Sequence, residues 1–237
     1  MLSVKKITAL CLSLLFCLAL LPGAALADTC TEHTFVLSDA TVPATIGADG
    51  TAEYVCSVCG EKKTEIVPAI ASVTLHPSSA AYKGKAQRPE IIATDSLGER
   101  IDSANYTVSL ATAQGVTVPF CKAIGKYTVT VTFTGKYAGE TALTFKIVPP
   151  ATDGISVTLA GSTVTVEYAP VEGATGYQVY YSKHKKGPFK KIAVTSKTYC
   201  THKIALGRDY YFKVRAYKKT ADGNIFGKWS STIKISA

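Results

Sequence analysis

Residues 127–134 alternate strictly between apolar and polar side chains, and this alternation constrains the fold more than any other feature of the chain. Tyr127, Val129, Val131 and Phe133 share one side, and four threonines share the other. A period of two residues predicts a half-buried antiparallel β-strand. Threonine and tyrosine are abundant, methionine occurs once, and no long amphipathic helical pattern follows residue 27. The sequence therefore predicts an all-β protein.

Two pairs of candidate metal ligands stand in the N-terminal segment, residues 28–70: Cys30 with His33, and Cys56 with Cys59. Two residues lie within each pair and 22 lie between the pairs, which is the spacing of a four-coordinate zinc site. The segment is short and poor in large apolar residues, so hydrophobic burial alone cannot fold it. A structural Zn²⁺ contributes on the order of 10–16 kcal/mol, and we expect the segment to lose structure on chelation.

Gly60 follows the second pair, and two short strands are expected around it at residues 51–55 and 63–67. A residue with positive φ at the tip of this hairpin lets backbone N–H groups point at the sulfurs. A disulfide between Cys56 and Cys59 remains an alternative to a metal. A catalytic zinc is disfavoured, because four paired ligands leave no open position for substrate.

The ligand spacing resembles Cys-x-x-His and Cys-x-x-Cys-Gly segments in extracellular proteins of Gram-positive gut bacteria. Those segments often end in an Ile-Pro-Ala phrase, which residues 66–69 match with one inserted valine. Relatives often carry a further cysteine in an Ala-Thr-Cys phrase, where this chain has Ile46. The resemblance implies a zinc-ribbon-like hairpin, and the departure at Ile46 leaves the four ligands intact.

The middle module, residues 71–149, carries several strand and turn patterns. Strands are expected at residues 71–75, 90–94, 106–110 and 141–148, with turns at 96–98 and 135–139. Five or more short strands at this spacing indicate a β-sandwich. Four motifs of this module resemble the small immunoglobulin-like repeats of bacterial surface proteins. They are Tyr-Lys-Gly-Lys-Ala-Gln-Arg-Pro at residues 82–89, Asn-Tyr-Thr-Val at 105–108, Gly-Lys-Tyr-Thr-Val at 125–129 and Phe-Lys-Ile at 145–147.

The C-terminal module, residues 150–237, follows the stiff pair Pro149-Pro150. Its strand patterns lie at residues 164–168, 176–181, 187–192 and 206–217. They resemble the fibronectin type III domain over its full length. The resemblance implies that Tyr210 is the corner tyrosine bonded to backbone, that Phe212, Val214 and Ala216 face the core, and that Tyr168 replaces a core tryptophan.

Residues 1–27 have the pattern of a secretory signal peptide. Lys5 and Lys6 precede an apolar run, and Ala25 and Ala27 form a small-x-small cleavage site. A retained membrane anchor is the alternative, but the apolar run of about 15 residues is shorter than the roughly 20 that span a bilayer. We expect export and no membrane span after cleavage. The expected division is therefore signal 1–27, zinc-ribbon-like segment 28–70, immunoglobulin-like domain 71–149 and fibronectin type III domain 150–237.

Five of the seven cysteines remain after signal removal, and an odd number argues against a fully paired disulfide framework. Three serve the candidate metal site, which leaves Cys121 and Cys200 in different modules. They fit small, partly buried strand residues, although a disulfide between the modules stays open. Cys200 with His202 shares a strand face but lacks the other parts of a nucleophilic site.

The positive charge of the chain is concentrated in its last module. Residues 151–237 contain 14 basic and 5 acidic residues, whereas residues 28–150 contain 10 and 12. Such an excess suggests an anionic partner, such as a cell-wall polymer or an acidic glycan, with a solvated lysine surface as the alternative. Five lysines form the candidate anion-binding patch: Lys183, Lys185, Lys186, Lys190 and Lys191.

Trp229 is a candidate sugar contact at the opening of the expected last strand, with packing over the sandwich edge as the alternative. The chain lacks a nucleotide-binding glycine loop, a Gly-x-Ser-x-Gly elbow and a His-Glu-x-x-His helix. We also expect no specific recognition of nucleic acid. The sequence thus predicts a secreted or surface-associated, non-catalytic binding or adhesion protein of a Gram-positive bacterium. The alternative is an accessory or spacer module of an extracellular polysaccharide-degrading system.

Overall fold

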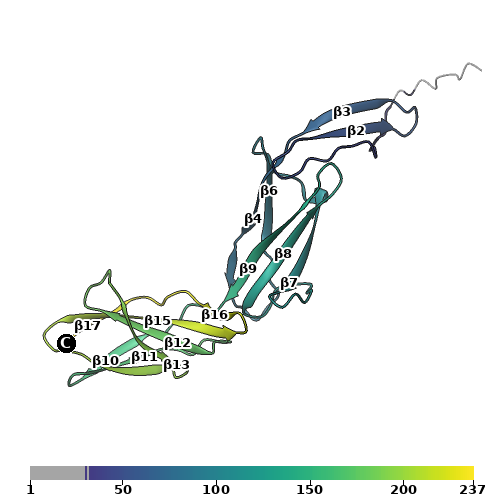
Figure 1. Ribbon diagram of the computed structural model, residues 1–237. Helices are drawn as coiled ribbons and strands as arrows, with labels where there is room; N and C mark the ends of the chain where they lie inside the picture. The colour runs from purple at the N-terminus through teal and green to yellow at the C-terminus, as the bar shows by residue number, and fades with distance from the viewer. Residues whose placement is uncertain (1–29, 31) are drawn as a thin grey trace, which may run out of the picture.

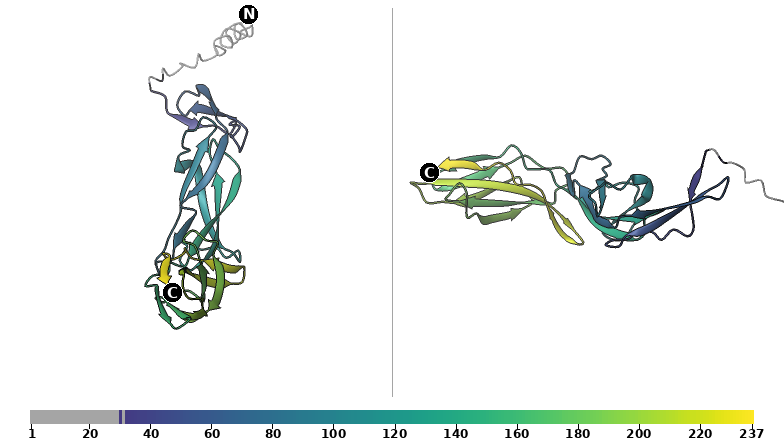
Figure 2. Two further views of the ribbon diagram at one scale, coloured as in Figure 1. Left: turned by 90° about the vertical axis from the view of Figure 1, so that its left-hand side faces the viewer. Right: turned by 90° about the horizontal axis from the view of Figure 1, so that it is seen from above.

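The structure is a computed structural model that describes residue 30 and residues 32–237. The expected signal peptide, residues 1–27, lies outside the described residues. The described chain is built from β-strands and one short 3-10 turn, η2 (Ser103–Asn105). In this part of the chain no helix has the length and apolar character needed to cross a membrane. Figure 1 shows the groups of strands following one another in an elongated arrangement, and Figure 2 shows it from two further sides.

A three-stranded antiparallel sheet comes first, in the order β1-β2-β3. Its strands are β1 (Phe35–Leu37), β2 (Gly50–Cys56) and β3 (Lys62–Val67). The predicted hairpin with a ligand pair at its tip is confirmed, and Gly60 has the predicted positive φ, at 76°. Five of the six residues of β3 are exposed, so little apolar burial supports the distal end of this sheet.

The next strands form a sandwich of two sheets. One sheet pairs β4 with β6, and the other has the order β5-β9-β8-β7 with β5 parallel to β9. The bounds are β4 (Ile70–His76), β5 (Ser79–Ala81), β6 (Glu90–Asp95), β7 (Tyr106–Thr112), β8 (Gly125–Phe133) and β9 (Glu140–Val148). The alternation predicted for residues 127–134 is confirmed, because Tyr127, Val129, Val131 and Phe133 are all buried.

The last strands form a second sandwich. One sheet has the order β10-β11-β14, and the other has the order β13-β12-β15-β16 with β17 also paired to β15. The bounds are β10 (Ser156–Ala160), β11 (Thr163–Glu167), β12 (Gly176–Ser182), β13 (Lys190–Thr195), β14 (Tyr199–Lys203), β15 (Asp209–Thr220), β16 (Gly223–Phe226) and β17 (Ile233–Ser236).

The core of this second sandwich agrees with the sequence prediction. Phe212, Val214 and Ala216 are fully buried. The hydroxyl of Tyr210 accepts a hydrogen bond from the backbone N–H of Ala205 at 3.1 Å, which is the predicted corner contact. The all-β fold of tandem small sandwiches behind a short hairpin segment is therefore observed.

Two local predictions are wrong. The strand expected at residues 187–192 begins only at Lys190, because Gly187 takes a φ of 93° in a turn and Pro188 has no N–H to donate. Trp229 does not open the last strand, since β17 begins at Ile233 and Trp229 lies in the connection before it.

The junctions between the groups of strands are packed. Ala44, Ala52 and Val67 from the N-terminal segment share one buried cluster with the first sandwich, and Ile225 of β16 enters the same cluster. At the other junction, a Cβ on Gly227 would approach the carbonyl oxygen of Pro149 to 2.7 Å, which leaves room only for glycine.

Candidate functional site

The fold brings Cys30, His33, Cys56 and Cys59 together. One ligand atom from each residue lies within 4.8 Å of the others. The Sγ atoms of Cys30 and Cys56 are 3.8 Å apart, and Sγ of Cys59 is 3.3 Å from Nδ1 of His33. The sequence-predicted ligand set is thus one cluster, and its cysteines are free thiols rather than partners in a disulfide.

Strand pairing positions the first ligand pair beside the second. Phe35 of β1 is in register with Cys56 of β2, so the residues just before β1 reach the hairpin tip. The backbone N–H of Ser57 donates to the carbonyl of Thr34 at 2.9 Å and extends this contact. The ring of His33 also stacks on Phe35, with ring centroids 5.5 Å apart.

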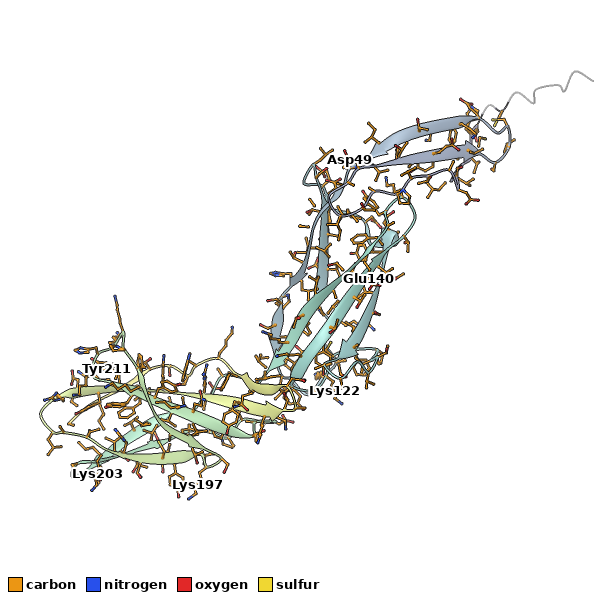
Figure 3. All side chains as sticks on the ribbon, in the orientation of Figure 1. Asp49, Lys122, Glu140, Lys197, Lys203 and Tyr211 are labelled. Atoms are coloured by element: carbon orange, nitrogen blue, oxygen red, sulfur yellow. The ribbon has the colours of Figure 1, made fainter. Side chains whose placement is uncertain are left out.

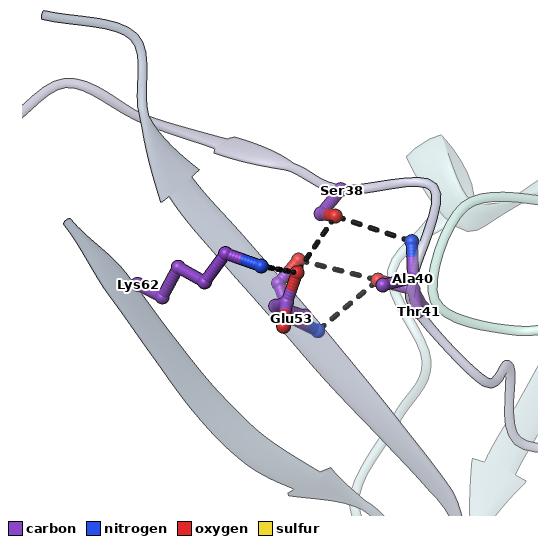
Figure 4. A network of polar contacts seen from close by, with 5 residues as sticks. All are labelled: Ser38, Ala40, Thr41, Glu53 and Lys62. Carbon is purple, nitrogen blue, oxygen red and sulfur yellow. Dashed lines mark hydrogen bonds and ion pairs between the residues drawn. The ribbon is translucent and has the colours of Figure 1, made fainter. Parts of the chain in front are cut away.

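A polar network anchors the chain that follows β1 to β2 (Figure 4). Oε1 of Glu53 accepts hydrogen bonds from the Ser38 hydroxyl at 2.9 Å and from Lys62 at 3.2 Å. The hydroxyl of Thr41 donates to the carbonyl of Glu53 and accepts from its N–H. The contacts to Ser38 and Lys62 hold the pKa of the Glu53 carboxyl below its ordinary value. The network fixes β1 and therefore the approach of Cys30 and His33.

The cluster fits a tetrahedral ion of the size of zinc. Two thiolates bound at about 2.3 Å in tetrahedral geometry stand about 3.8 Å apart, and the Cys30 and Cys56 sulfurs have that separation. Three sulfurs and one imidazole nitrogen are soft and borderline ligands, which select zinc over magnesium or calcium. All four protein positions are filled, as in structural rather than catalytic zinc sites.

Glu61 adds a contact that sequence reasoning missed. Its Oε2 lies 3.0 Å from Nε2 of His33, so the ring can donate to the carboxylate while Nδ1 faces the sulfurs. A carboxylate on the outer nitrogen orients a metal-binding histidine and raises its basicity. Its position two residues after Cys59 was the available sequence signal, since it places Glu61 immediately before the return strand β3.

The thiols differ in how readily they ionise. Backbone N–H groups of Cys59 and Val58 point at Cys56 and lower the pKa of its thiol to about 6. Loss of hydration and the neighbouring Cys56 raise the pKa of the Cys30 thiol to about 11. The hairpin turn thus already favours a thiolate at Cys56, as a metal ligand requires.

The five predicted lysines are all exposed, and they have different neighbours. Lys183 and Lys190 line a shallow pocket with Tyr181 and His184. Lys191 is in register with Tyr180, whose ring packs against Trp229 at 4.9 Å. Lys185 and Lys186 lie in the β12–β13 connection, not on a strand.

Trp229 is half-buried, and two cations that the sequence analysis did not single out pack on it. Nζ of Lys213 lies 4.3 Å from a centroid of the indole, and the guanidinium carbon of Arg215 lies 4.5 Å away. The alternation of β15 was the available signal, because Lys213 and Arg215 alternate with its core residues. Cys121 and Cys200 are buried free thiols, each in a different core cluster.

No protein-family model matches the chain, and no curated protein matches its sequence. Solved structures of similar topology include a segment of two fibronectin type III domains from chicken tenascin. It is 14% identical, covers 86% of this chain and 98% of its own, and has a TM-score of 0.40. A cytokine receptor complex is 14% identical over 70% of this chain and 96% of its own, with a TM-score of 0.44. A segment of titin is 11% identical, covers 87% of this chain and 99% of its own, and has a TM-score of 0.31. The fold assignment rests on the sheets described above, because these scores are low.

Proposed function

We propose that this chain is a secreted or surface-associated, non-catalytic binding protein. Its basic fibronectin type III module holds an anionic cell-wall polymer or glycan and thereby supports adhesion. One observation carries the proposal: Lys183 and Lys190 line a pocket with Tyr181 and His184 in the module that holds the chain's positive excess. Converging cations beside an aromatic ring suit an acidic sugar.

The cysteine and histidine of β14 support the absence of catalysis. Cys200 is buried, and burial raises the pKa of its thiol to about 11. A nucleophilic cysteine needs a lowered pKa and access to substrate. The ring of His202 packs on the ring of Tyr181, with centroids 4.9 Å apart. Its observed contact is therefore with an aromatic ring and not with the thiol of Cys200.

The test compares the mature chain, residues 28–237, with a variant in which all five patch lysines become glutamate. Wall polymers and acidic glycans are the probes, and binding is expected to fall at least tenfold at low salt. A control variant carries five Lys→Glu changes elsewhere, at Lys83, Lys85, Lys122, Lys126 and Lys146 of the middle module. Equal binding by the patch variant and the unmodified protein would remove the basic patch from the proposal.

We further propose that the cysteine-histidine cluster holds one structural Zn²⁺ through Cys30, His33, Cys56 and Cys59. The separations within the cluster and its sulfur-rich ligand set support this assignment. Metal analysis of protein purified without added metal is expected to find one zinc per chain. A zinc content near zero in a folded preparation would contradict the assignment.

The second candidate function is an accessory module of a polysaccharide-degrading system, and Trp229 would then contact sugar. The partial exposure of its indole supports this, while the cations packed on the ring oppose it. Saturable binding of neutral glycans that disappears in Trp229→Ala would favour this candidate. The division at residues 70/71 and 149/150 also remains a proposal, and limited proteolysis would locate the cleavable connections.

A further inference from the structure

In the C-terminal module, the face of the larger sheet that points away from the core carries several cationic side chains. On β12 and β15, Val179 and Val214 point into the core, so their neighbours in sequence point outward. The outward residues include Tyr180 and Lys213, which are directly in register. Lys191 of β13 is in register with Tyr180 from the other side. Three neighbouring strands therefore present a row of lysine, tyrosine and lysine.

A stack of rings and cations lies beside this row. Lys213 lies between Phe189 and Trp229, at 4.1 Å and 4.3 Å from the ring centroids. Arg215 lies between Trp229 and Phe226, at 4.5 Å and 4.0 Å. We call the outward surface formed by Lys191, Tyr180, Lys213, Arg215 and Trp229 the ladder face.

The connection that presents Trp229 is anchored to β15. The hydroxyl of Ser230 accepts from the backbone N–H of Val214 at 3.0 Å, and the N–H of Ser230 donates to the carbonyl of Val214 at 2.8 Å. Ser230 is buried. The ring and its two cations are therefore held in place before any ligand arrives, which lowers the ordering cost of binding.

Among the described residues, neither Lys191 nor Lys213 nor Arg215 forms an ion pair with an acidic side chain. Asp209 is the only acidic residue in β12, β13, β15, β16 and β17, and it is paired with Lys234 at 2.8 Å. The hydrogen bonds recorded for Arg215 in the described chain use Nε and Nη2 and both go to Gln178 Oε1. Burial and the charge of Arg215 lower the pKa of Lys213. Stacking on rings partly compensates two adjacent cations, but it provides no counter-charge.

We propose that the ladder face is the binding surface for a polysaccharide that bears carboxylate groups along an extended chain. This inference rests on the proposed function and places its site on the outward face of the sheet, at Lys191, Lys213 and Arg215, rather than at the pocket lined by Lys183 and Lys190. Residues two strands apart are separated by about 10 Å, and residues i and i+2 on one strand by about 7 Å. These separations place Lys191, Lys213 and Arg215 where successive acidic groups of one polymer can reach them. A guanidinium edge with unused N–H donors suits a carboxylate in particular.

The experiment uses polygalacturonate as the anionic probe and dextran as its neutral counterpart. Three double variants each lose two positive charges. They are Lys191→Gln with Lys213→Gln on the ladder face, Lys183→Gln with Lys185→Gln in the loop, and Lys197→Gln with Lys203→Gln as the control. In Figure 3 the labels of Lys197 and Lys203 lie on the opposite side of the module from Tyr211, which is an outward residue of β15.

The ladder-face variant is expected to weaken polygalacturonate binding at least tenfold, and the control variant less than threefold. Lys191 is not one of the two cations that stack on Trp229. The single variant Lys191→Gln should therefore weaken binding several-fold and leave the tryptophan fluorescence unchanged. This result would separate a loss of binding from a loss of folding. Weakening by the loop variant alone would overturn the ladder face and keep the proposed function. Equal weakening by all three variants would show a non-specific electrostatic attraction to the whole module, and it would also overturn the ladder face as the binding surface. An unmodified protein that binds none of the acidic polymers would remove the proposed function itself.

Discussion

Removal of the proposed zinc is the most informative perturbation of this chain, because the structure indicates which residues should lose their order. The hairpin tip, residues 55–63, contains one buried residue, Cys56. The base of the same hairpin is different, since Ala52 and Val67 are buried in the core of the first sandwich. The sequence alone predicted that residues 28–70 lose structure when the metal is removed. The structure limits this expectation to the part of the segment that lies outside the core of the first sandwich. We expect chelation to unfold the tip and the ligands before β1, and to leave the base folded.

The magnitude follows from the length of the tip. Fixing the backbone of one residue costs about 1–2 kcal/mol, so ordering these nine residues costs about 9–18 kcal/mol. A structural zinc contributes an apparent 10–16 kcal/mol, which is of the same size. Burial of Cys56 alone contributes only a small fraction of this. Without the ion, no contribution of comparable size offsets this cost, so the free energy of local opening at the tip should fall to zero or below.

Amide hydrogen exchange at residue resolution measures this opening directly. Protein is exchanged with zinc, and again after treatment with a chelator and a reductant that keeps the thiols free. Protection of Val55 and Lys63 should fall to nearly unfolded values. Protection of Val67 and Val129 should stay within about a factor of three and serves as the internal control. Unchanged protection at the tip of a demonstrably zinc-free protein would refute the reasoning.

Three further predictions follow from single contacts. Glu61→Gln should weaken zinc binding by about 10–100-fold in a competition titration with a chromogenic chelator, because the outer nitrogen of the histidine loses its carboxylate. Cys121 and Cys200 should not react with a thiol reagent at pH 8 in the folded protein, since both are buried and burial raises their pKa above the ordinary value. Tyr210→Phe should lower the free energy of unfolding by about 1–3 kcal/mol in urea, because the N–H of Ala205 loses its acceptor.

Each of these predictions has a matched control. Glu99→Gln removes an acidic charge far from the cluster and should leave zinc affinity unchanged. Reaction of both core thiols in urea shows that they are present and unoxidised, and their rapid reaction without urea would contradict the burial argument. Tyr199→Phe removes a hydroxyl from an exposed ring of the same module, and an equal loss of stability in both variants would discount the corner contact.

Local pattern was sufficient for much of the fold. The alternation at residues 127–134 defined β8 and its buried face, because a period of two depends only on neighbouring residues. The spacing of Cys30, His33, Cys56 and Cys59 defined the cluster, because ligand pairs at a hairpin tip are short-range features. Short strands with weak patterns, such as β1 and β5, were missed because pairing with a neighbour rather than local sequence makes them strands.

The candidate surfaces depended more on tertiary structure. The lysine patch was defined from proximity in sequence, but Lys190 and Lys191 point to different sides of a strand, as neighbours on a strand must. Glu61 was missed because its importance comes from the ring nitrogen that it faces. Trp229 was singled out from the sequence as a candidate sugar contact, but its neighbours come from β12 and β15 and could not be inferred from its own position.

The sequence by itself therefore determined the β-strand character, the four members of the cysteine-histidine cluster and the concentration of positive charge in the last module. Tertiary structure alone decided which cations share a face, that Lys213 and Arg215 enclose Trp229, and that the base of the first hairpin belongs to a neighbouring core. The physical reason is that composition and period are local properties of a chain. Which side chains lie next to one another depends on strand register, and register is set by pairing between distant segments of the chain.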